Sequence, residues 1–328
     1  MTNSNGNASQ KNGHSSIKAA FSPGDVVANR YRIVRAIGQG GTGEVYEALD
    51  TGLGVPVALK TLKPSVAGDA VQLERFRREI QSARKVTHPN ICRIFDMGVH
   101  TSNGRERFFL TMELLDGSSL AQRLETGDTF IPEEALPIVE QIAEGLHAAH
   151  LAGVVHRDLK PGNVMLLSPP TGRLAPRTVI TDFGIALSDE QGEIRLTQSG
   201  ELVGTPEYMA PEQGDMGPAR PTTDIYALGL ILYEMLSKER PFSAGATPLE
   251  TVLLRRRQPP RPLRDFLPDV DPVWEATIHR CLERAPERRF QDAAAVVAAL
   301  HGATPEPPSS TPSTPEGGFF GRFTRKLR

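Results

Sequence analysis

The chain has 328 residues, of which 39% are hydrophobic, and a formal net charge of −2 at pH 7. This length exceeds what one hydrophobic core usually fills, so we expect a globular protein built from two lobes. The small net charge argues against a general attraction to nucleic acid or to anionic membranes.

Cysteine usage and hydropathy bear on the compartment. The two cysteines, Cys92 and Cys281, lack the spacing of a zinc site, so we expect buried free thiols in a reducing environment. Residues 1–20 lack the apolar stretch of a signal peptide, and nowhere do 18 apolar residues follow one another. These features predict a cytoplasmic protein with no membrane span in this chain.

Both ends of the chain are polar and of low complexity. Residues 1–25 begin with an Asn-, Ser- and Gly-rich stretch, and residues 303–328 include the run "ATPEPPSSTPSTPEGG". Neither end buries enough apolar surface to offset its ordering entropy, so we predict disordered ends around a folded domain at 26–302. The final "FFGRFTRKLR" is aromatic and basic, which leaves a weak membrane- or partner-docking peptide as the alternative.

The front of the domain has the short apolar runs of a β-rich lobe. "YRIVRAIG" (31–38), "VPVALK" (55–60) and "RFFLTMELL" (107–115) are predicted strands separated by turn residues. One helix, "LERFRREIQSARKV" (73–86), interrupts them. We place this lobe at about residues 31–113.

A glycine-rich stretch near the start suggests phosphate binding. Gly38, Gly40 and Gly43 have GxGxxG spacing, and missing side chains let backbone amides approach a phosphate closely. A dinucleotide-binding fold would place a helix after the third glycine, whereas Val45 begins a second β-like run. We therefore predict a strand-to-strand hairpin that binds phosphate. The alternative is a flexible hairpin that binds no ligand.

Lys60 closes the next strand and Glu79 lies on the following helix. A lysine that ends an apolar strand is often a surface residue, but beside a glycine hairpin it can reach phosphate oxygens. Glu79 is the predicted counter-ion of Lys60, and Glu74 on the same helix is the alternative.

From about residue 132 the apolar residues adopt helical spacing. "IPEE" opens a helix whose apolar positions, such as Ile138, Ile142 and Leu146, recur every three or four residues. "IYALGLILYEML" (225–236) and "DAAAVVAAL" (292–300) continue this pattern. A helical lobe at about 117–301 therefore follows the β-rich lobe, with "MELLDGSSL" joining them.

Six motifs then occur in the order of the protein-kinase signature, over about residues 31–301. They are the glycine hairpin with Val45, the strand "VALK", the helix with Glu79, "HRDLKPGN" (156–163), "DFG" (182–184) and "APE" (210–212). The chain resembles a bacterial Ser/Thr protein kinase of the Hanks type. The resemblance implies an α+β, bilobal fold with a small β-rich N-terminal lobe and a larger helical C-terminal lobe.

The resemblance also implies an ATP site. Its matched residues are Ile37, Gly38, Gly40, Gly43, Val45, Ala58, Lys60, Glu79, Met112, Glu113, Leu115, Leu166 and Asp182. The glycines would cover the ATP phosphates, Lys60 would contact the α and β phosphates, and Glu79 would hold Lys60. Adenine would lie against Ala58 and Leu166, with Met112 as gatekeeper and with Glu113 and Leu115 supplying backbone contacts.

The implied catalytic residues are Asp158, Lys160, Asn163 and Lys60. Asp158 would orient the substrate hydroxyl and accept its proton, while Lys160 would steady the γ-phosphate. Asp182 and Asn163 would ligate Mg²⁺, for which Mn²⁺ is an alternative, because oxygen ligands suit a hard cation.

The implied activity is transfer of the ATP γ-phosphoryl group to Ser/Thr hydroxyls of proteins in bacterial signalling. Lys160 and "GTPEYMAPE" (204–212) resemble Ser/Thr kinases rather than tyrosine kinases, and Thr205 would shape the acceptor pocket. Two other functions stay open: a catalytically silent scaffold, and a phosphotransferase acting on small molecules. Lys60 and Asp158 argue against the first, and the complete "GTPEYMAPE" segment argues against the second.

Activation-loop phosphorylation is the implied regulation. Thr197 and Ser199 lie between "DFG" and "APE", and a phosphate there could pair with Arg157 and order the loop. Autophosphorylation at one or both is our hypothesis, with plain solvation of the two hydroxyls as the alternative. An activating dimer is a further partner that the resemblance allows.

Other charged residues are predicted to be architectural. The resemblance gives His156 a packing role near "DFG", Asp224 a role in anchoring the catalytic loop, and Glu212 an ion pair with Arg289. His147 and His150 lack a third metal ligand and are expected to be structural. "LLSPPTGRLAPRTVI" and "MGVHTSNGRERF" are longer than usual for the family and are predicted to extend loops away from the site, while "LLRRRQPPRPLR" is expected to be a solvated face.

Overall fold

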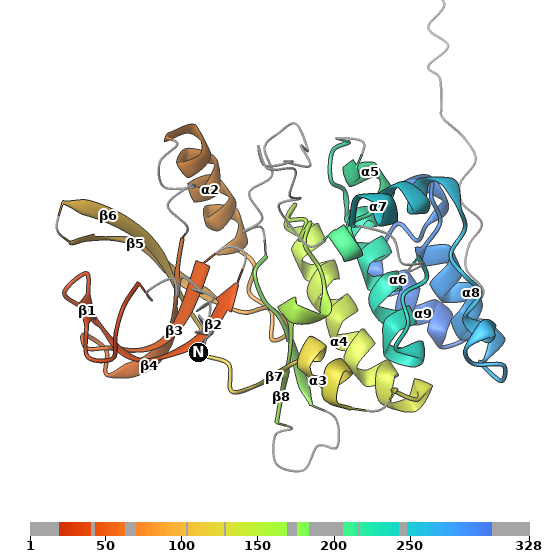
Figure 1. The fold of residues 1–328 in the computed structure, drawn as a ribbon, viewed down its shortest axis with the longest axis horizontal. Helices are drawn as coiled ribbons and strands as arrows, with labels where there is room; N and C mark the ends of the chain where they lie inside the picture. The colour runs from red at the N-terminus through yellow and green to blue at the C-terminus, as the bar shows by residue number, and fades with distance from the viewer. Residues whose placement is uncertain are drawn as a thin grey trace, which may run out of the picture.

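A computed structural model describes residues 20–40, 43–62, 70–102, 104–127, 129–168, 176–183, 206–214, 217–242 and 248–303. Over these residues the chain forms a β-rich lobe and a helical lobe, connected through the residues between β6 and β7 (Figure 1). The predicted bilobal α+β architecture is confirmed.

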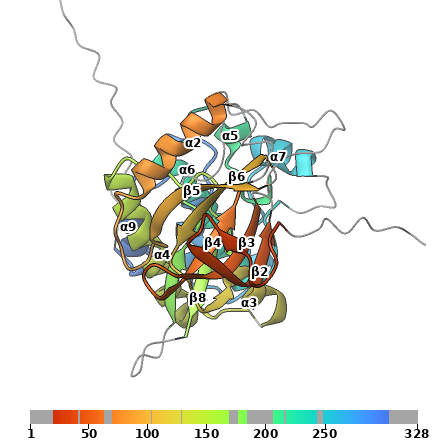
Figure 2. The ribbon, with the colours of Figure 1, turned by 90° about the vertical axis from the view of Figure 1, so that its left-hand side faces the viewer.

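Six antiparallel strands form the sheet of the N-terminal lobe, in the order β1-β2-β3-β4-β6-β5. The strands are β1 (Val26–Val27), β2 (Tyr31–Gly40), β3 (Gly43–Asp50), β4 (Val55–Thr61), β5 (Ile94–Ser102) and β6 (Arg105–Met112). Helix α2 (Ala70–Ala83) lies against this sheet (Figure 2). All three predicted strands and the predicted helix are present.

The alternation of β4 assigns its side chains to two faces of the sheet. Val57 and Leu59 pack into an apolar cluster on one face, whereas Ala58 and Lys60 point to the other, since successive side chains in a strand alternate. Leu62, just beyond the strand, packs with Phe76 of α2. The strand therefore presents Lys60 on the same face as Ala58.

The N-terminal edge of the fold differs from its prediction. Phe21 is buried in the outer cluster of the sheet, with its ring 5.7 Å from that of Tyr46 and its N–H donating to the Tyr46 hydroxyl at 3.1 Å. The prediction of a disordered segment to residue 25 is therefore wrong for residues 20–25. One aromatic ring in a polar stretch anchors this end of the segment.

Helices build the C-terminal lobe, together with a small antiparallel sheet in the order β7-β8-β9. The α-helices are α3 (Leu120–Thr126), α4 (Pro132–Leu151), α5 (Pro211–Gly214), α6 (Pro221–Ser237), α7 (Pro248–Arg257), α8 (Pro272–Cys281) and α9 (Ala293–Leu300). The strands are β7 (Gly117–Ser119), β8 (Val164–Leu167) and β9 (Arg177–Ile180), and the 3₁₀ turns are η1 (Pro161–Asn163), η2 (Pro206–Tyr208), η3 (Leu263–Asp265) and η4 (Pro286–Arg288).

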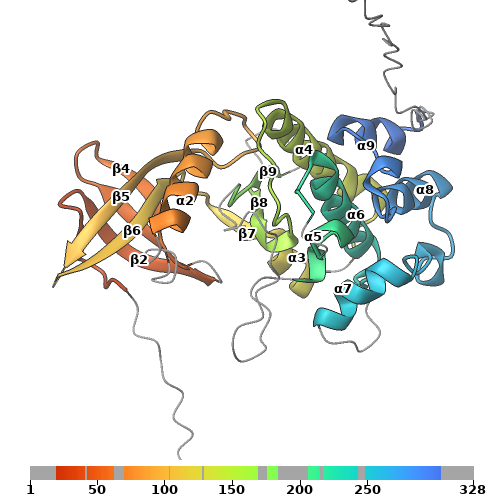
Figure 3. The ribbon, with the colours of Figure 1, turned by 90° about the horizontal axis from the view of Figure 1, so that it is seen from above.

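Helix α6 lies at the centre of the C-terminal core. Its residues from Thr222 to Tyr233 are all buried, because α4, α8 and other elements pack around it (Figure 3). A helix buried on all sides is expected to be apolar, as this sequence is from Ile225 to Tyr233. Asp224 is the charged exception between Thr222 and Tyr233, and a buried carboxylate needs hydrogen-bond partners.

Other sequence predictions concern two long loops, the C-terminal tail and membrane spans. "MGVHTSNGRERF" lies in the β5–β6 hairpin, where Ser102 pairs with Arg105 at the tip. Part of "LLSPPTGRLAPRTVI" and the tail from residue 304 lie outside the described residues. Among the helices of the described ranges, none is both long and apolar enough to cross a membrane.

Candidate active site

The loop at residues 156–163 brings three polar side chains together. Lys160 Nζ lies 2.7 Å from Asp158 Oδ2, and Asn163 Nδ2 donates to the Asp158 carbonyl at 2.8 Å. Asn163 Nδ2 also lies 3.3 Å from Asp158 Oδ2. The side chain of Asp158 is 33% exposed, so its carboxylate is accessible to a hydroxyl group.

A buried carboxylate fixes the backbone of this loop. Asp224 Oδ2 accepts from the His156 N–H at 2.8 Å, and its Oδ1 accepts from the Arg157 N–H at 2.9 Å. His150 Nε2 lies 2.7 Å from the same carboxylate. Arg157 has φ +68°, a left-handed conformation that is costly without glycine, so Asp224 holds a strained turn just before Asp158. Asp224 and His150 thus have the architectural roles expected of them.

His156 is packed near "DFG", as the resemblance implied. Its fully buried ring lies 4.6 Å from the ring of Phe183, and its Nε2 lies 2.9 Å from the Thr181 carbonyl. The Thr181 N–H donates to the Asn163 carbonyl at 2.8 Å. These contacts join the catalytic loop to the segment that carries Asp182.

Lys60 reaches that segment from the other lobe. Lys60 is 3% exposed, and its ammonium group lies 2.7 Å from Asp182 Oδ2. Asp182 has φ +62°, a second left-handed non-glycine residue in the site. The predicted phosphate-binding residue, Lys60, and the predicted metal ligand, Asp182, therefore form an ion pair.

The predicted contact between Glu79 and Lys60 is not present. Glu79 Oε1 lies 2.6 Å from Arg157 Nη1, and Lys60 pairs with Asp182. Burial raises the pKa of the Glu79 carboxyl above its usual range, although Arg157 opposes this shift. A partly buried carboxylate needs a cation, and on α2 Glu79 finds it in the catalytic loop. The prediction that Glu79 holds Lys60 is wrong for this conformation.

The glycine hairpin is present as predicted. Gly38 pairs with Val45, and Gly40 pairs with Gly43, at the end of β2 and β3; residues 41 and 42 are outside the described ranges. A Cβ on Gly43 would lie 1.7 Å from the Thr61 carbonyl oxygen. Gly43 is therefore needed for close packing on β4 as well as for any approach to phosphate. Ile37, just before the hairpin, is an exposed side chain.

An apolar cluster lines the region assigned to adenine. Ala58 and Met112 are paired across β4 and β6, and both are buried with Cys92 and Val179. The partly buried members of the cluster are Val45, Leu114, Leu115, Met165 and Leu167. The cluster brings together Val45 and Ala58 of the N-terminal sheet with residues of the small β7-β8-β9 sheet.

Leu166 is not part of that cluster. It packs against the C-terminal core, whereas Met165 and Leu167, its neighbours on β8, pack with Ala58 and Met112. Side chains alternate along a strand, so a position one residue away points to the opposite face. The prediction of Leu166 as an adenine contact is wrong, and Met165 and Leu167 are the apolar side chains that β8 offers in its place.

The hinge has part of its hydrogen bonding already used. The Glu113 N–H donates to the Arg93 carbonyl at 2.9 Å, so a ligand contact from Glu113 has to come from its carbonyl. The Glu113 carboxylate lies 3.1 Å from Arg177 Nη1, so it is engaged in an ion pair rather than in a ligand contact. Cys92 and Cys281 are buried free thiols, as expected, and burial raises the pKa of each to about 12.

The residues fit a divalent cation of the hard type. Asp182 offers a partly exposed carboxylate. Asn163 donates through Nδ2 to the Asp158 carbonyl, so its amide oxygen, the atom that would ligate a cation, points away from that carbonyl. Oxygen ligands from one or two protein residues, completed by phosphate, are typical of Mg²⁺ sites. Over the described ranges no three His, Cys, Asp or Glu residues gather into a metal site built by the protein alone.

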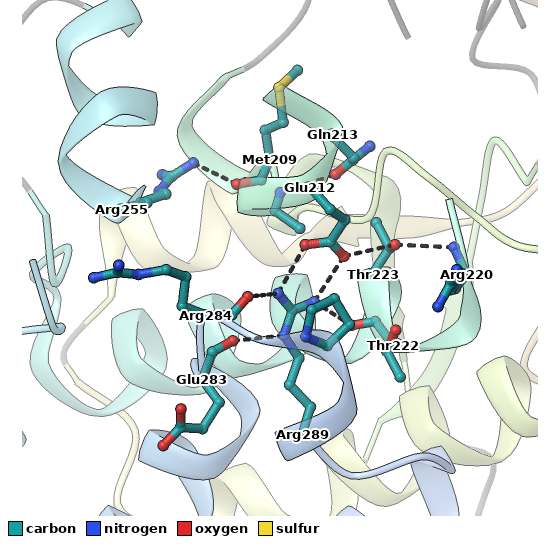
Figure 4. Close-up of polar contacts among 12 residues, drawn as sticks. Met209, Glu212, Gln213, Arg220, Thr222, Thr223, Arg255, Glu283, Arg284 and Arg289 are labelled. Carbon is teal, nitrogen blue, oxygen red and sulfur yellow. Dashed lines mark hydrogen bonds and ion pairs between the residues drawn. The ribbon is translucent and has the colours of Figure 1, made fainter. Parts of the chain in front are cut away.

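An ion pair between Glu212 and Arg289 anchors the "APE" segment at residues 210–212. Arg289 is fully buried and donates to both carboxylate oxygens of Glu212 at 2.8 Å, as the resemblance implied (Figure 4). It also donates to the carbonyls of Thr222, Glu283 and Arg284. Glu212 in turn accepts from the Thr223 hydroxyl.

Two residues of this region were missed in the sequence. Arg255 of α7 is buried and donates to the carbonyl of Met209 at 2.8 Å (Figure 4). It also donates to the carbonyl of Glu207. The run "LLRRRQPPRPLR" is therefore not uniformly solvated. Gln213 donates to the Arg157 carbonyl at 2.8 Å. Neither residue has a sequence signal, because both bind backbone groups. Thr197, Ser199 and Thr205 lie outside the described residues.

The fold, the catalytic loop and the Lys60–Asp182 pair together define a protein kinase. Residues 31–299 match the family described as protein kinase domain, and the chain belongs to this family.

Named bacterial kinases are among its relatives. The serine/threonine-protein kinase PknA of Mycobacterium tuberculosis is 39% identical over 294 residues, which cover 88% of this chain and 65% of PknA. The probable serine/threonine-protein kinase PknB of Corynebacterium glutamicum is 34% identical over 84% of this chain and 42% of its own length. The chain thus spans less than two thirds of either relative.

A solved structure agrees with the fold. The crystal structure of the Mycobacterium tuberculosis PknI kinase domain matches with a TM-score of 0.68 and 28% identity, over 87% of this chain and 100% of that chain.

Proposed function

We propose that this chain transfers the γ-phosphoryl group of ATP to serine and threonine hydroxyls of proteins. The observation that carries the proposal is the accessible carboxylate of Asp158 beside Lys160 and Asn163. Membership of the protein kinase family supports it, as do the names of the bacterial relatives. Lys160 and "GTPEYMAPE" support Ser/Thr rather than tyrosine acceptors.

In the proposed reaction, the acceptor oxygen attacks the γ-phosphorus while its proton passes to Asp158. The bond from the γ-phosphorus to the oxygen that bridges it to the β-phosphate breaks, and ADP leaves with the electron pair. Lys160 offers its ammonium group to the γ-phosphate oxygens. Asp158 finally returns the proton to water.

Lys60 and the glycine hairpin would bind the remaining phosphates. The buried ammonium group of Lys60 would contact the α and β phosphates, and the amides of Gly38, Gly40 and Gly43 would cover them. Asp182 and Asn163 would hold Mg²⁺, which supplies positive charge to the phosphate oxygens when it is bound. Mn²⁺ is the alternative cation, and the same two ligands would hold it.

Activation would exchange the ion pairs of the site. A phosphate at Thr197 or Ser199, added by autophosphorylation, would attract Arg157 and compete with Glu79 for its guanidinium group. Glu79 would then be free to turn to Lys60, whose partner Asp182 is needed for the cation. The contacts supporting this step are Arg157–Glu79 at 2.6 Å and Lys60–Asp182 at 2.7 Å.

Labelled ATP tests the proposal. The chain is incubated with labelled ATP, Mg²⁺ and a generic protein acceptor, beside the variant Asp158→Asn. We expect label on serine and threonine of the acceptor and of the chain itself, and at least about a hundredfold loss in the variant, since the proton acceptor is removed. ATP binding without transfer to any protein would indicate a scaffold, and transfer only to small metabolites would indicate a small-molecule phosphotransferase.

Mass spectrometry tests the regulatory part. We expect phosphate at Thr197, Ser199 or both in active protein, and lower activity in a double alanine variant. Neither site modified, with full activity in that variant, would contradict autophosphorylation as the activating step.

Proteins with Ser/Thr acceptors are the proposed partners. A docking role for the basic and aromatic end, residues 319–328, is a weaker proposal, as is an activating dimer. Deletion of residues 319–328 without any change in partner capture would remove the docking proposal.

A further inference from the structure

Gln213 spans two segments of the site with one amide group. Its Oε1 accepts from the Ala210 N–H at 2.9 Å, and its Nε2 donates to the Arg157 carbonyl at 2.8 Å. Ala210 lies just before α5, in the segment that precedes Glu212. Arg157 lies immediately before Asp158.

The carbonyl that Gln213 binds belongs to the peptide unit joining Arg157 to Asp158. The N–H of the same unit donates to His156 Nδ1 at 3.3 Å. The peptide unit before it, between His156 and Arg157, donates its N–H to Asp224. Gln213 thus completes the fixation of a left-handed turn whose next side chain is the carboxylate of Asp158. A rotation of this peptide unit would move Asp158 relative to its acceptor.

The other end of the bridge is rigid as well. Arg289 binds Glu212, the residue before Gln213, through both carboxylate oxygens. Arg255 binds the carbonyl of Met209, the residue before Ala210 (Figure 4). The amide of Gln213 therefore projects from a backbone that is already held on both sides, which lowers the entropy lost in making its two bonds.

We propose that Gln213 is a positioning residue for phosphoryl transfer, which sets the orientation of Asp158 relative to the segment at residues 206–210. This inference rests on the proposed function. It assigns Gln213 an effect on turnover and on the KM of the protein acceptor, and none on ATP affinity, because no ATP-site residue contacts its side chain among the described hydrogen bonds.

The variant Gln213→Glu separates positioning from general stability. An ionised glutamate can still accept from Ala210 but cannot donate to the Arg157 carbonyl, so two oxygens face each other. We expect kcat to fall about 10- to 100-fold at pH 8, as for an unsatisfied polar pair. The introduced carboxylate would be half-buried and would face the Arg157 carbonyl oxygen, and both effects raise its pKa above the ordinary value of about 4.3. Protonation restores a donor, so the ratio of variant to wild-type kcat should rise as the pH falls from about 8 to about 5.

Two further variants complete the experiment. Gln213→Met removes both bonds without adding charge and should lose activity equally at all pH values. Gln258→Glu makes the same change at an exposed position of the C-terminal lobe and should behave as wild type. Peptide KM and kcat, ATP affinity and thermal unfolding are measured for all three in the full chain.

The outcomes are distinct. A pH-dependent recovery of Gln213→Glu, with ATP affinity within about twofold of wild type, supports the inference. Wild-type kcat in Gln213→Glu at every pH overturns it, as does a loss in Gln213→Glu and Gln213→Met that follows only the unfolded fraction. Absence of transfer by the unchanged chain overturns the proposed function, and this inference with it.

Discussion

Three strained or crowded backbone positions surround the catalytic groups. Arg157 and Asp182 adopt left-handed conformations without being glycine, and Gly43 leaves no room for a Cβ against β4. Such positions persist only where the surroundings over-determine them. Here the carboxylate of Asp224 and the ammonium group of Lys60 supply part of that constraint.

Gly43 and Gly38 are predicted to differ in their response to alanine. In Gly43→Ala the new Cβ meets the Thr61 carbonyl at 1.7 Å, and this backbone cannot move without shifting β4. We expect the free energy of unfolding to fall by about 1–3 kcal/mol, as for overpacking. In Gly38→Ala the nearest atom is Val45 Cβ at 3.9 Å, so stability should be retained. Urea denaturation of the two variants compares them, and equal stabilities would contradict the close approach to Thr61.

Met165 and Leu166 are predicted to affect different properties. Met165 packs with the apolar cluster that contains Ala58. Met165→Ala should therefore raise the KM for ATP by about tenfold, because the variant loses the apolar surface that the methionine side chain would bury against the nucleotide. Leu166 packs on the C-terminal core, so Leu166→Ala should lower the melting temperature and leave the KM for ATP near wild type. Steady-state kinetics and thermal unfolding separate the two. The reverse pattern would show that Leu166 faces the nucleotide.

The sequence predicts which candidate catalytic residues lie together better than it predicts the contacts of the residues around them. Asp158, Lys160 and Asn163 belong to one short motif, so local geometry brings them together. Glu79 lies on a helix whose position depends on packing, and the sequence does not say which of two cations it meets. Leu166 was misplaced by one residue because period-2 alternation gives two faces, and a resemblance alone did not determine which face is turned to the apolar cluster around Ala58.

At the scale of elements, helices position the loops that carry chemistry. Helix α6 brings Asp224 under the catalytic loop, and α7 brings Arg255 to the carbonyls of Met209 and Glu207. Burial lowers the pKa of the Arg255 guanidinium group below its usual range. Its carbonyl partners offset that desolvation, which makes the contact between α7 and the segment at 206–210 specific.

Arg255 is predicted to support binding of the protein acceptor. In Arg255→Gln the side chain no longer reaches both carbonyls with charged donors, so we expect the KM for a peptide to rise about 5- to 10-fold, as for lost hydrogen bonds to a charged group. Arg255→Lys should recover part of this, since lysine keeps the charge but not the planar fork. The KM for ATP should not change. Arg256→Lys, at an exposed neighbour, is the control, and a wild-type peptide KM in Arg255→Gln would count against the contact.

At the scale of the molecule, ion pairs between described residues connect the lobes, and two of them involve the candidate site. Lys60 of the N-terminal sheet meets Asp182, and Glu79 of α2 meets Arg157 of the catalytic loop. The bilobal order of strands and helices follows from periodicity and motif order alone. The pairing between lobes does not follow, because it depends on how the lobes close. The ordered contact of Phe21 was missed for another reason, since a single aromatic ring in a polar stretch gives no periodic signal, although it packs on the sheet that carries the glycine hairpin and "VALK".

The Glu79–Arg157 pair predicts how activity depends on phosphorylation. In the proposed activation, the Arg157–Glu79 pair keeps Glu79 from Lys60 until the loop is phosphorylated, so Arg157→Gln should release Glu79. We expect the dephosphorylated Arg157→Gln variant to be about 3- to 10-fold more active than dephosphorylated wild type, the effect of losing one partly exposed ion pair of about 1 kcal/mol. The same variant should gain little from phosphorylation, because the loop phosphate has lost its partner.

Phosphatase treatment followed by a peptide assay measures both quantities. A ratio of phosphorylated to dephosphorylated activity near one, together with raised basal activity, is the combined signature of a contact that inhibits before phosphorylation and activates after it. If Arg157 served only to bind the phosphate, the ratio would also approach one, but basal activity would stay at or below that of wild type. The basal rate of Arg157→Gln therefore decides whether closure of the lobes through Glu79 opposes catalysis.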